Sequence, residues 1–251
     1  MNKRTYRIGQ IVPSSNITME TEVPLMLSRA VVPNDVTFTF HSSRAPMKNV
    51  SAPELAAMNG HMERCARELS DARMDIIASA CLVAIMSQGV GYHRKTQAEL
   101  EAVCHVEAPD TQVITSAGAL VDSLKAIGTK RVSFITPYMK GLTELVAGYI
   151  ENEGIKVKDT ISLEIPNNLE VGAQDPKNLI EIVKRLDTSK VDAVVLSACV
   201  QMPSLSALAE VQKSFDVPVL STAAATVFQI LKALNLPTVV PDAGELLSGK
   251  Y

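Results

Sequence analysis

The sequence has no long apolar run and no large excess of charge of one sign. Its formal net charge is −3 at pH 7 and its pI is about 5.9, without a basic stripe. Nucleic acid and anionic membrane surfaces are therefore poor candidates as partners. No stretch approaches the ~18 apolar residues of a membrane span, and Met1 to Ile11 lacks the continuous apolar region of a signal peptide. We expect a cytoplasmic protein with no membrane or nucleic-acid partner.

Cysteine is also scarce, with four in 251 residues. The four form neither a Cys-x-x-Cys pair nor a cluster with histidine, so we expect no metal site. In a reducing compartment they are expected to be thiols rather than a disulfide framework. Cys65 and Cys104 each lie at helical spacing among apolar residues, which predicts two inert core positions.

The other two cysteines end strand-like segments with the same tripeptide. Asp75 to Ala78 runs into Ser79-Ala80-Cys81, and Asp192 to Leu196 runs into Ser197-Ala198-Cys199. Short apolar runs of this kind are typical of buried parallel strands, which deliver side chains to a binding crevice at their carboxyl ends. Cys81 and Cys199 are therefore the leading candidates for chemistry.

A second matched pair of segments indicates two homologous halves. Arg7 to Pro13 resembles Arg131 to Pro137, with the two prolines 124 positions apart, and the cysteines Cys81 and Cys199 are 118 positions apart. Halves of about 120 residues fit the usual domain size of about 100 to 150. Packed about a pseudo-twofold axis, they would point one thiol each at the two faces of a small molecule. Coincidence is the alternative, because short apolar strands that end in small residues are common.

Strand and helix patterns alternate along the chain, which predicts an α/β fold. We expect two similar Rossmann-like lobes with parallel sheets and the active site in the cleft between them, the first from residues 1–115 plus 220–251 and the second from 116–219. Capping-box patterns at Ser51 and Thr96 predict two helix starts. The expected strands are Tyr6 to Val12, Val36 to His41, Asp75 to Ala80, Gln112 to Ile114, Arg131 to Thr136, Val157 to Ile165, Asp192 to Ser197 and Val217 to Leu220.

The carboxyl ends of these strands are rich in neutral hydrogen-bond donors, which suit a carboxylate ligand. For any one of these residues, capping of the next helix is the alternative role. Arg44 is ambiguous between balancing ligand charge and lying at the surface, and no role is assigned to the four histidines. The strand ends read Pro13-Ser14-Ser15-Asn16, Ser42-Ser43-Arg44, Cys81-Leu82, Pro137-Tyr138, Pro166-Asn167-Asn168, Cys199-Val200-Gln201 and Ser221-Thr222.

These segments resemble the maleate cis-trans isomerase family of the aspartate/glutamate racemase superfamily, over nearly the whole chain. Both cysteines and the other elements of the resemblance occur in the family's order. The segments that carry it are Val12-Pro13-Ser14-Ser15-Asn16, Ser79-Ala80-Cys81-Leu82-Val83-Ala84, Thr136-Pro137-Tyr138-Met139-Lys140, Asn168-Leu169-Glu170-Val171-Gly172 and Ser197-Ala198-Cys199.

The resemblance implies a cofactor-independent conversion of maleate to fumarate. Cys81, as a thiolate, adds to C2 of maleate while Cys199 protonates C3, and rotation about the resulting single bond precedes elimination. It also implies a hydrogen bond from Tyr138 near the intermediate, a homo-oligomer (a dimer or a tetramer), and a place in the degradation of nicotinate-type rings. The implied substrate-binding residues are Asn16, Asn168 (or its neighbour Asn167), Ser14 and Ser15, with Leu82, Val83 and Val200 as the apolar wall.

Other readings of the same residues remain open. Amino-acid racemases of the superfamily usually follow their cysteines with Asn-Thr and Thr, where this chain has Leu82 and Val200. Arylmalonate decarboxylases resemble the chain around Pro13 but keep only the second cysteine. A non-enzymatic dicarboxylate-binding module would not need the thiols, and a redox pair would need sulfur atoms about 2 Å apart.

Overall fold

A computed structural model describes residues 3–251 as two parallel four-stranded sheets with the same strand order. The first sheet has the order β2-β1-β3-β4 and the second has the order β6-β5-β7-β8. Each position in one sheet thus has a counterpart in the other, which supports the duplication predicted from the two matched segments. The strands are β1 (Arg4–Pro13), β2 (Val36–Ala45), β3 (Ile76–Ser79), β4 (Gln112–Thr115), β5 (Arg131–Thr136), β6 (Lys156–Ser162), β7 (Ala193–Ser197) and β8 (Val219–Ser221).

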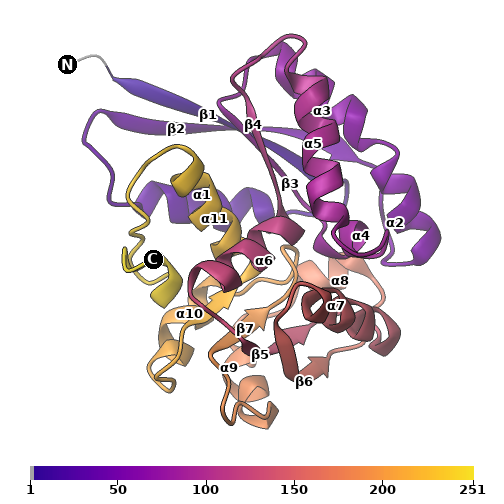
Figure 1. The fold of residues 1–251 in the computed structure, drawn as a ribbon, viewed down its shortest axis with the longest axis vertical. Coiled ribbons are helices and arrows are strands. Elements are labelled where there is room, and N and C mark those ends of the chain that lie inside the picture. The colour runs from indigo at the N-terminus through magenta and orange to yellow at the C-terminus, as the bar shows by residue number, and fades with distance from the viewer. Residues whose placement is uncertain (1–2) are drawn as a thin grey trace.

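Helices follow most strands and complete two α/β lobes, so the predicted fold class is confirmed (Figure 1). The inner strands β3 and β7 are buried along their whole length, as expected where both faces of a sheet are covered. The helices are α1 (Met19–Arg29), α2 (Ala52–Asn59), α3 (Met62–Asp71), α4 (Leu82–Met86), α5 (Tyr92–Cys104), α6 (Ser116–Ala126), α7 (Lys140–Asn152), α8 (Asn168–Gly172), α9 (Asn178–Ile182), α10 (Leu205–Gln212) and α11 (Thr222–Ala233), with 3-10 turns at Val183–Arg185 and Glu245–Leu247.

The final long helix, α11, connects the two lobes. It follows β8 of the second sheet, yet it packs on α1, β3 and β4 of the first lobe and on α6. In Figure 1, α6 and α11 lie between the two sheets. Because α6 belongs to the predicted second lobe, α11 packs on both lobes, and the boundaries 1–115 plus 220–251 and 116–219 stay a prediction.

Two equivalent contacts tie the lobes together at helix starts. The Glu22 carboxylate on α1 accepts hydrogen bonds from the backbone N–H groups of Ser204 and Leu205, both at 2.7 Å, at the start of α10. The Tyr149 hydroxyl on α7 accepts from the backbone N–H of His93 at 3.1 Å, at the start of α5. Each lobe therefore caps a helix of the other.

Some predicted element ends were wrong. The pattern at Thr96 lies inside α5, which begins at Tyr92 after Gly91, a residue with φ +68°. Ser51 does occupy the N-cap of α2, but its side chain makes no capping hydrogen bond. The strand expected to run to Ile165 ends at Ser162, and the chain turns at Glu164, where φ is +56°. Within residues 3–251, no helix combines the length and the apolar character needed to cross a bilayer.

Candidate active site

Five of the seven predicted strand ends meet around one small cavity between the lobes, and the ends at Ser42 to Arg44 and Ser221 to Thr222 do not line it. Both cysteines and Tyr138 lie in its wall, as do Met47 and Val50, which come from the segment between β2 and α2. The space between the side chains measures about 10 Å³, which is room for roughly one water. A dicarboxylate needs more room, so its entry requires wall residues to move. The full lining is Pro13, Asn16, Met47, Val50, Cys81, Leu82, Val83, Tyr138, Asn168, Cys199, Val200 and Gln201.

Cys81 occupies the turn between β3 and α4. Its φ of 74° lies in the left-handed region, which costs roughly 1–3 kcal/mol for a residue with a Cβ and is typical of functional sites. The side chain is buried, with 7% of the residue exposed. Burial raises the pKa of its thiol to about 12, against a hydrogen bond from the backbone of Ala84 that lowers it. In the closed cavity Cys81 is therefore a neutral thiol.

Cys199, after β7, has a different set of neighbours. Burial also raises the pKa of its thiol, but the Tyr138 hydroxyl and the backbone N–H groups of Gln201 and Met202 donate to the sulfur and lower it. The Gln201 nitrogen lies 3.4 Å from the sulfur. Burial keeps the pKa of Tyr138 well above its usual value, so the phenol is protonated and able to donate. A negative charge on Cys199 would meet three donors.

Asn16 presents an unused donor to the cavity. Its Oδ1 accepts from the backbone N–H of Met19 at 3.0 Å, which fixes the orientation of the carboxamide at the start of α1. Its Nδ2 is buried and has no hydrogen-bond partner among the described residues. Because a buried N–H without an acceptor is unfavourable by about 1–3 kcal/mol, an acceptor on a ligand is the natural partner.

Asn168 contributes the second carboxamide, from the start of α8 in the other lobe. It is 3% exposed, lines the cavity, and donates through Nδ2 to the Ser15 hydroxyl at 2.8 Å. Its neighbour Asn167 is the N-cap of α8, where its side chain accepts from the Leu169 N–H at 2.9 Å. Of the two residues left open by the sequence, Asn168 is the one in the cavity wall.

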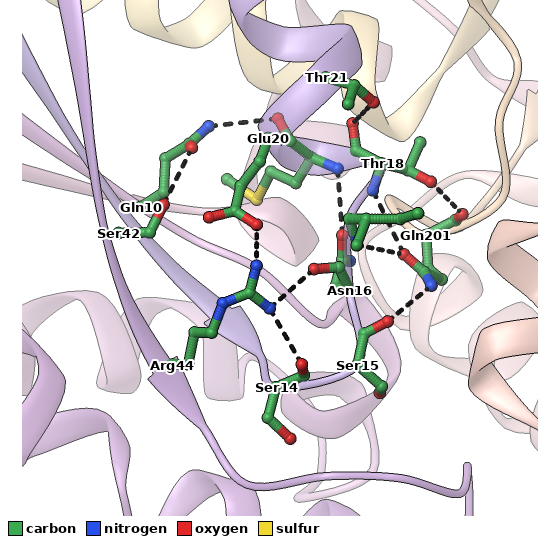
Figure 2. A network of polar contacts seen from close by, with 12 residues as sticks. Gln10, Ser14, Ser15, Asn16, Thr18, Glu20, Thr21, Ser42, Arg44 and Gln201 are labelled. Carbon is green, nitrogen blue, oxygen red and sulfur yellow. Dashed lines mark hydrogen bonds and ion pairs between the residues drawn. The ribbon is translucent and has the colours of Figure 1, made fainter.

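Ser14 and Ser15 lie outside the cavity lining and bond the segment between β2 and α2. The Ser14 hydroxyl accepts from the Met47 N–H at 3.0 Å, and the Ser15 hydroxyl donates to the Met47 carbonyl at 2.6 Å. Arg44 is also outside: it donates to the carbonyls of Ser14 and Asn16 and forms an ion pair with Glu20 (Figure 2). These side chains hold the loop that carries Asn16.

The cavity also contains residues to which the sequence analysis gave no role. Gln201 lies two positions after Cys199 and four after the end of β7, so its place in a strand end is the one local signal for it. Met47 and Val50 give no local signal, because they reach the site through the chain path after β2.

In the described part of the chain all four cysteines are unpaired thiols, and no group of three or more His, Cys, Asp or Glu side chains is placed to hold a metal.

Two thiols face one cavity at the junction of two similar α/β lobes. This arrangement is that of an enzyme whose acid–base and nucleophilic groups are side chains of its own chain. The matching family model is that of arylmalonate decarboxylase, over residues 8–247. A more specific relationship comes from full-length relatives. A maleate isomerase from Geobacillus stearothermophilus is 59% identical over 247 residues, covering 98% of each chain.

Solved structures agree with this relationship. The maleate isomerase of Pseudomonas putida, a cysteine-to-alanine variant with maleate, has a TM-score of 0.96 at 55% identity and covers 99% of both chains. A cysteine-to-serine variant of the Nocardia farcinica maleate cis-trans isomerase, with a covalently bound succinylcysteine intermediate, has a TM-score of 0.94 at 42% identity and covers 99% of this chain and 100% of that chain. The chain belongs to the maleate isomerase family.

Proposed function

We propose that this protein isomerises maleate to fumarate through a succinyl adduct on Cys81. The observation that carries the proposal is that Cys81 and Cys199 face one cavity together with the unpartnered Nδ2 of Asn16. The solved relatives that hold maleate and a succinylcysteine support the same substrate and the same kind of intermediate.

Substrate binding uses the two carboxamides. Asn16 and Asn168 come from different lobes and donate to the two carboxylates of maleate, so that the double bond lies between the thiols. Neutral donors provide hydrogen bonds without fixing each carboxylate in an ion pair, which leaves one end able to rotate. Leu82, Val83 and Val200 form the apolar wall that restricts water. In this proposal Ser14 and Ser15 affect substrate binding indirectly, through the Met47 segment to which they are hydrogen-bonded.

The chemistry needs one proton shared by two sulfur atoms. The pair first loses one proton to solvent, and the charge settles on Cys199, where three donors oppose the effect of burial on the pKa; Cys199 then takes the proton of Cys81. The Cys81 sulfur then forms a bond to C2, the π electrons of the double bond move to C3, and C3 takes the proton from Cys199. The result is a thioether on Cys81 and a thiolate on Cys199. The donors around Cys199, including the Tyr138 hydroxyl, stabilise that thiolate.

The return steps use the same groups in reverse order. After rotation about the C2–C3 single bond, Cys199 removes a proton from C3, the bond from C2 to the Cys81 sulfur breaks, and the double bond forms again in the trans arrangement. The pair ends with the same charge and the same number of protons with which it began. Every step is carried by a side chain of this protein, without a cofactor.

The direct test is incubation of purified protein with maleate, followed by proton NMR. The expected result is fumarate, with an adduct of maleate's mass on the Cys81 peptide after a rapid quench. D-Aspartate accumulating from L-aspartate, with no fumarate from maleate, would support the racemase reading instead.

We propose in addition that the enzyme is a cytoplasmic homo-oligomer, a dimer or a tetramer, that acts in the breakdown of nicotinate-type rings. The family resemblance supports the oligomer and the role in ring breakdown. Light scattering on the purified protein measures the oligomeric state, and a single 27.0 kDa species would contradict it.

A further inference from the structure

Gln201 connects the two halves of the site through a single carboxamide. Its residue is 3% exposed, and it lines the cavity beside Cys199. Its Nε2 donates to the carbonyl of Ser15 at 3.0 Å and to the carbonyl of Asn168 at 2.9 Å. Its Oε1 accepts from the backbone N–H of Ile17 at 3.1 Å. Figure 2 shows this side chain lying against the loop of residues 14–18.

The bonding partners of Gln201 surround the two carboxamides that the proposed function assigns to substrate. Ser15 and Ile17 are the two neighbours of Asn16 in the chain, so the peptide groups on both sides of Asn16 are held. The third partner is the carbonyl of Asn168 itself. One planar amide group therefore spans the boundary between the lobes and fixes the backbone at both substrate-binding positions.

Gln201 has little freedom to move. Its own carbonyl accepts from the Thr18 hydroxyl at 2.7 Å, and its backbone nitrogen lies 3.4 Å from the Cys199 sulfur. A Cβ added at Gly172 would lie 2.5 Å from its Nε2, so the absence of a side chain at Gly172 leaves the space that the amide occupies. A shift of this amide would move both carboxamides and the environment of one thiol.

We infer that Gln201 is a positioning residue that sets the separation of the Asn16 and Asn168 side chains, so that the site selects dicarboxylates by the spacing of their two carboxylates. This inference rests on the proposed function for the assignment of the two asparagines. Glutamine suits the role because glutamate lacks the donor for the two carbonyls, and methionine, of similar length, forms none of the bonds.

The test compares Gln201→Met with a matched control, Gln10→Met. Gln10 is a fully buried glutamine whose Nε2 donates to the Met19 carbonyl at 3.2 Å, within the first lobe and outside the cavity lining. The probes are cis- and trans-cyclobutane-1,2-dicarboxylate, which are rigid and have no double bond for a thiol to attack. Calorimetry gives the Kd of each probe for each variant, and a thermal melt confirms folding.

The wild type and Gln10→Met are expected to bind the cis probe about tenfold or more tightly than the trans probe, and Gln201→Met is expected to lose that preference. Both variants lower the melting temperature, so the ratio of the two Kd values separates positioning from a loss of stability. A cis preference that persists in folded Gln201→Met, or one absent from the wild type, would overturn the inference.

If Gln201→Met does not fold, Gln201→Glu takes its place. As a carboxylate it accepts from Ile17 but cannot donate to Ser15 or Asn168. On protonation at low pH it regains one donor, so its cis preference is expected to recover as the pH falls, and a preference equal to that of the wild type at every pH would overturn the inference. If the wild type prefers the cis probe and Gln201→Met does not, but no fumarate forms from maleate, the proposed function fails and the role of Gln201 stands.

Discussion

Burial of the Cys81 thiol predicts slow alkylation that keeps accelerating with pH. Its pKa is about 12, against an ordinary value of 9.0. The alkylating nucleophile is the thiolate. At pH 8 a thiol of that pKa is ionised in about 1 part in 10⁴, and an ordinary thiol in about 1 part in 10, so ionisation alone slows alkylation about 10³-fold, equivalent to about 4 kcal/mol.

The assay is labelling with iodoacetamide from pH 6 to pH 10, with the rate measured on the Cys81 peptide by mass spectrometry and compared with a small free thiol. We expect the rate to rise about tenfold per pH unit across the whole range, because the pKa lies above it. Limited access to the closed cavity lowers every rate by the same factor and leaves this slope unchanged.

A plateau with a midpoint below about pH 9 would refute the reasoning, since it would mean that donors around the sulfur outweigh desolvation. Peptide mapping also separates Cys81 from Cys104, a core thiol whose pKa burial raises to about 11. Cys104 provides an internal control for opening of the core, as distinct from opening of the cavity.

Three further predictions follow from the site and the lobe contacts. Cys81→Ser is expected to lose nearly all turnover in the fumarate assay, because an alkoxide is hard to form. Cys199→Ser loses acid–base assistance, so its turnover is expected to fall about 10²- to 10⁴-fold. An adduct found only on Cys199 would reverse the two roles. Gly172→Ala is expected to raise KM for maleate about tenfold and to lower the melting temperature, because it displaces the Gln201 amide from its hydrogen bonds. Gly148→Ala, where an added Cβ meets nothing within 4 Å, is expected to leave KM unchanged. Burial raises the pKa of the Glu22 carboxyl above its ordinary value of 4.5. The contribution of Glu22 to folding stability is therefore complete below pH 4.5 and is lost as the pH rises through the raised pKa of the folded state. Thermal melts of Glu22→Gln should lack that part of the pH dependence, and a pH profile identical to that of the wild type would contradict the prediction.

The strands were predictable because their signal is local. Apolar runs such as those before Cys81 and Cys199 are long enough to identify buried parallel strands, and the eight expected strands all occur among residues 3–251. Helix starts were harder to place, as Thr96 shows. Its capping pattern is overridden because the N-cap of α5 is Gly91, five residues earlier, where the chain turns.

The same distinction between local and distant signals applies to the site. Cys81, Cys199, Tyr138, Asn16 and Asn168 were found because each follows a strand or a recognisable motif, and all of them line the cavity. Contacts between distant segments were not encoded locally. Nothing near Met47 predicts that it lines a cavity, and nothing near Gln201 predicts that it bonds residues 183 to 186 positions away.

The path of α11 has a consequence for how the chain folds during synthesis. This helix packs on α1, β3 and β4, and nine of its residues are buried. The ribosome therefore releases the whole second sheet before the segment that covers this part of the first lobe exists. Until then the apolar surface of α1 and of the β3–β4 edge stays open to water, so the nascent first lobe is a partly folded species that exposes a surface prone to aggregation. Completion of both lobes depends on the last part of the chain, and a truncation before Thr222 should impair the half of the protein that was made first.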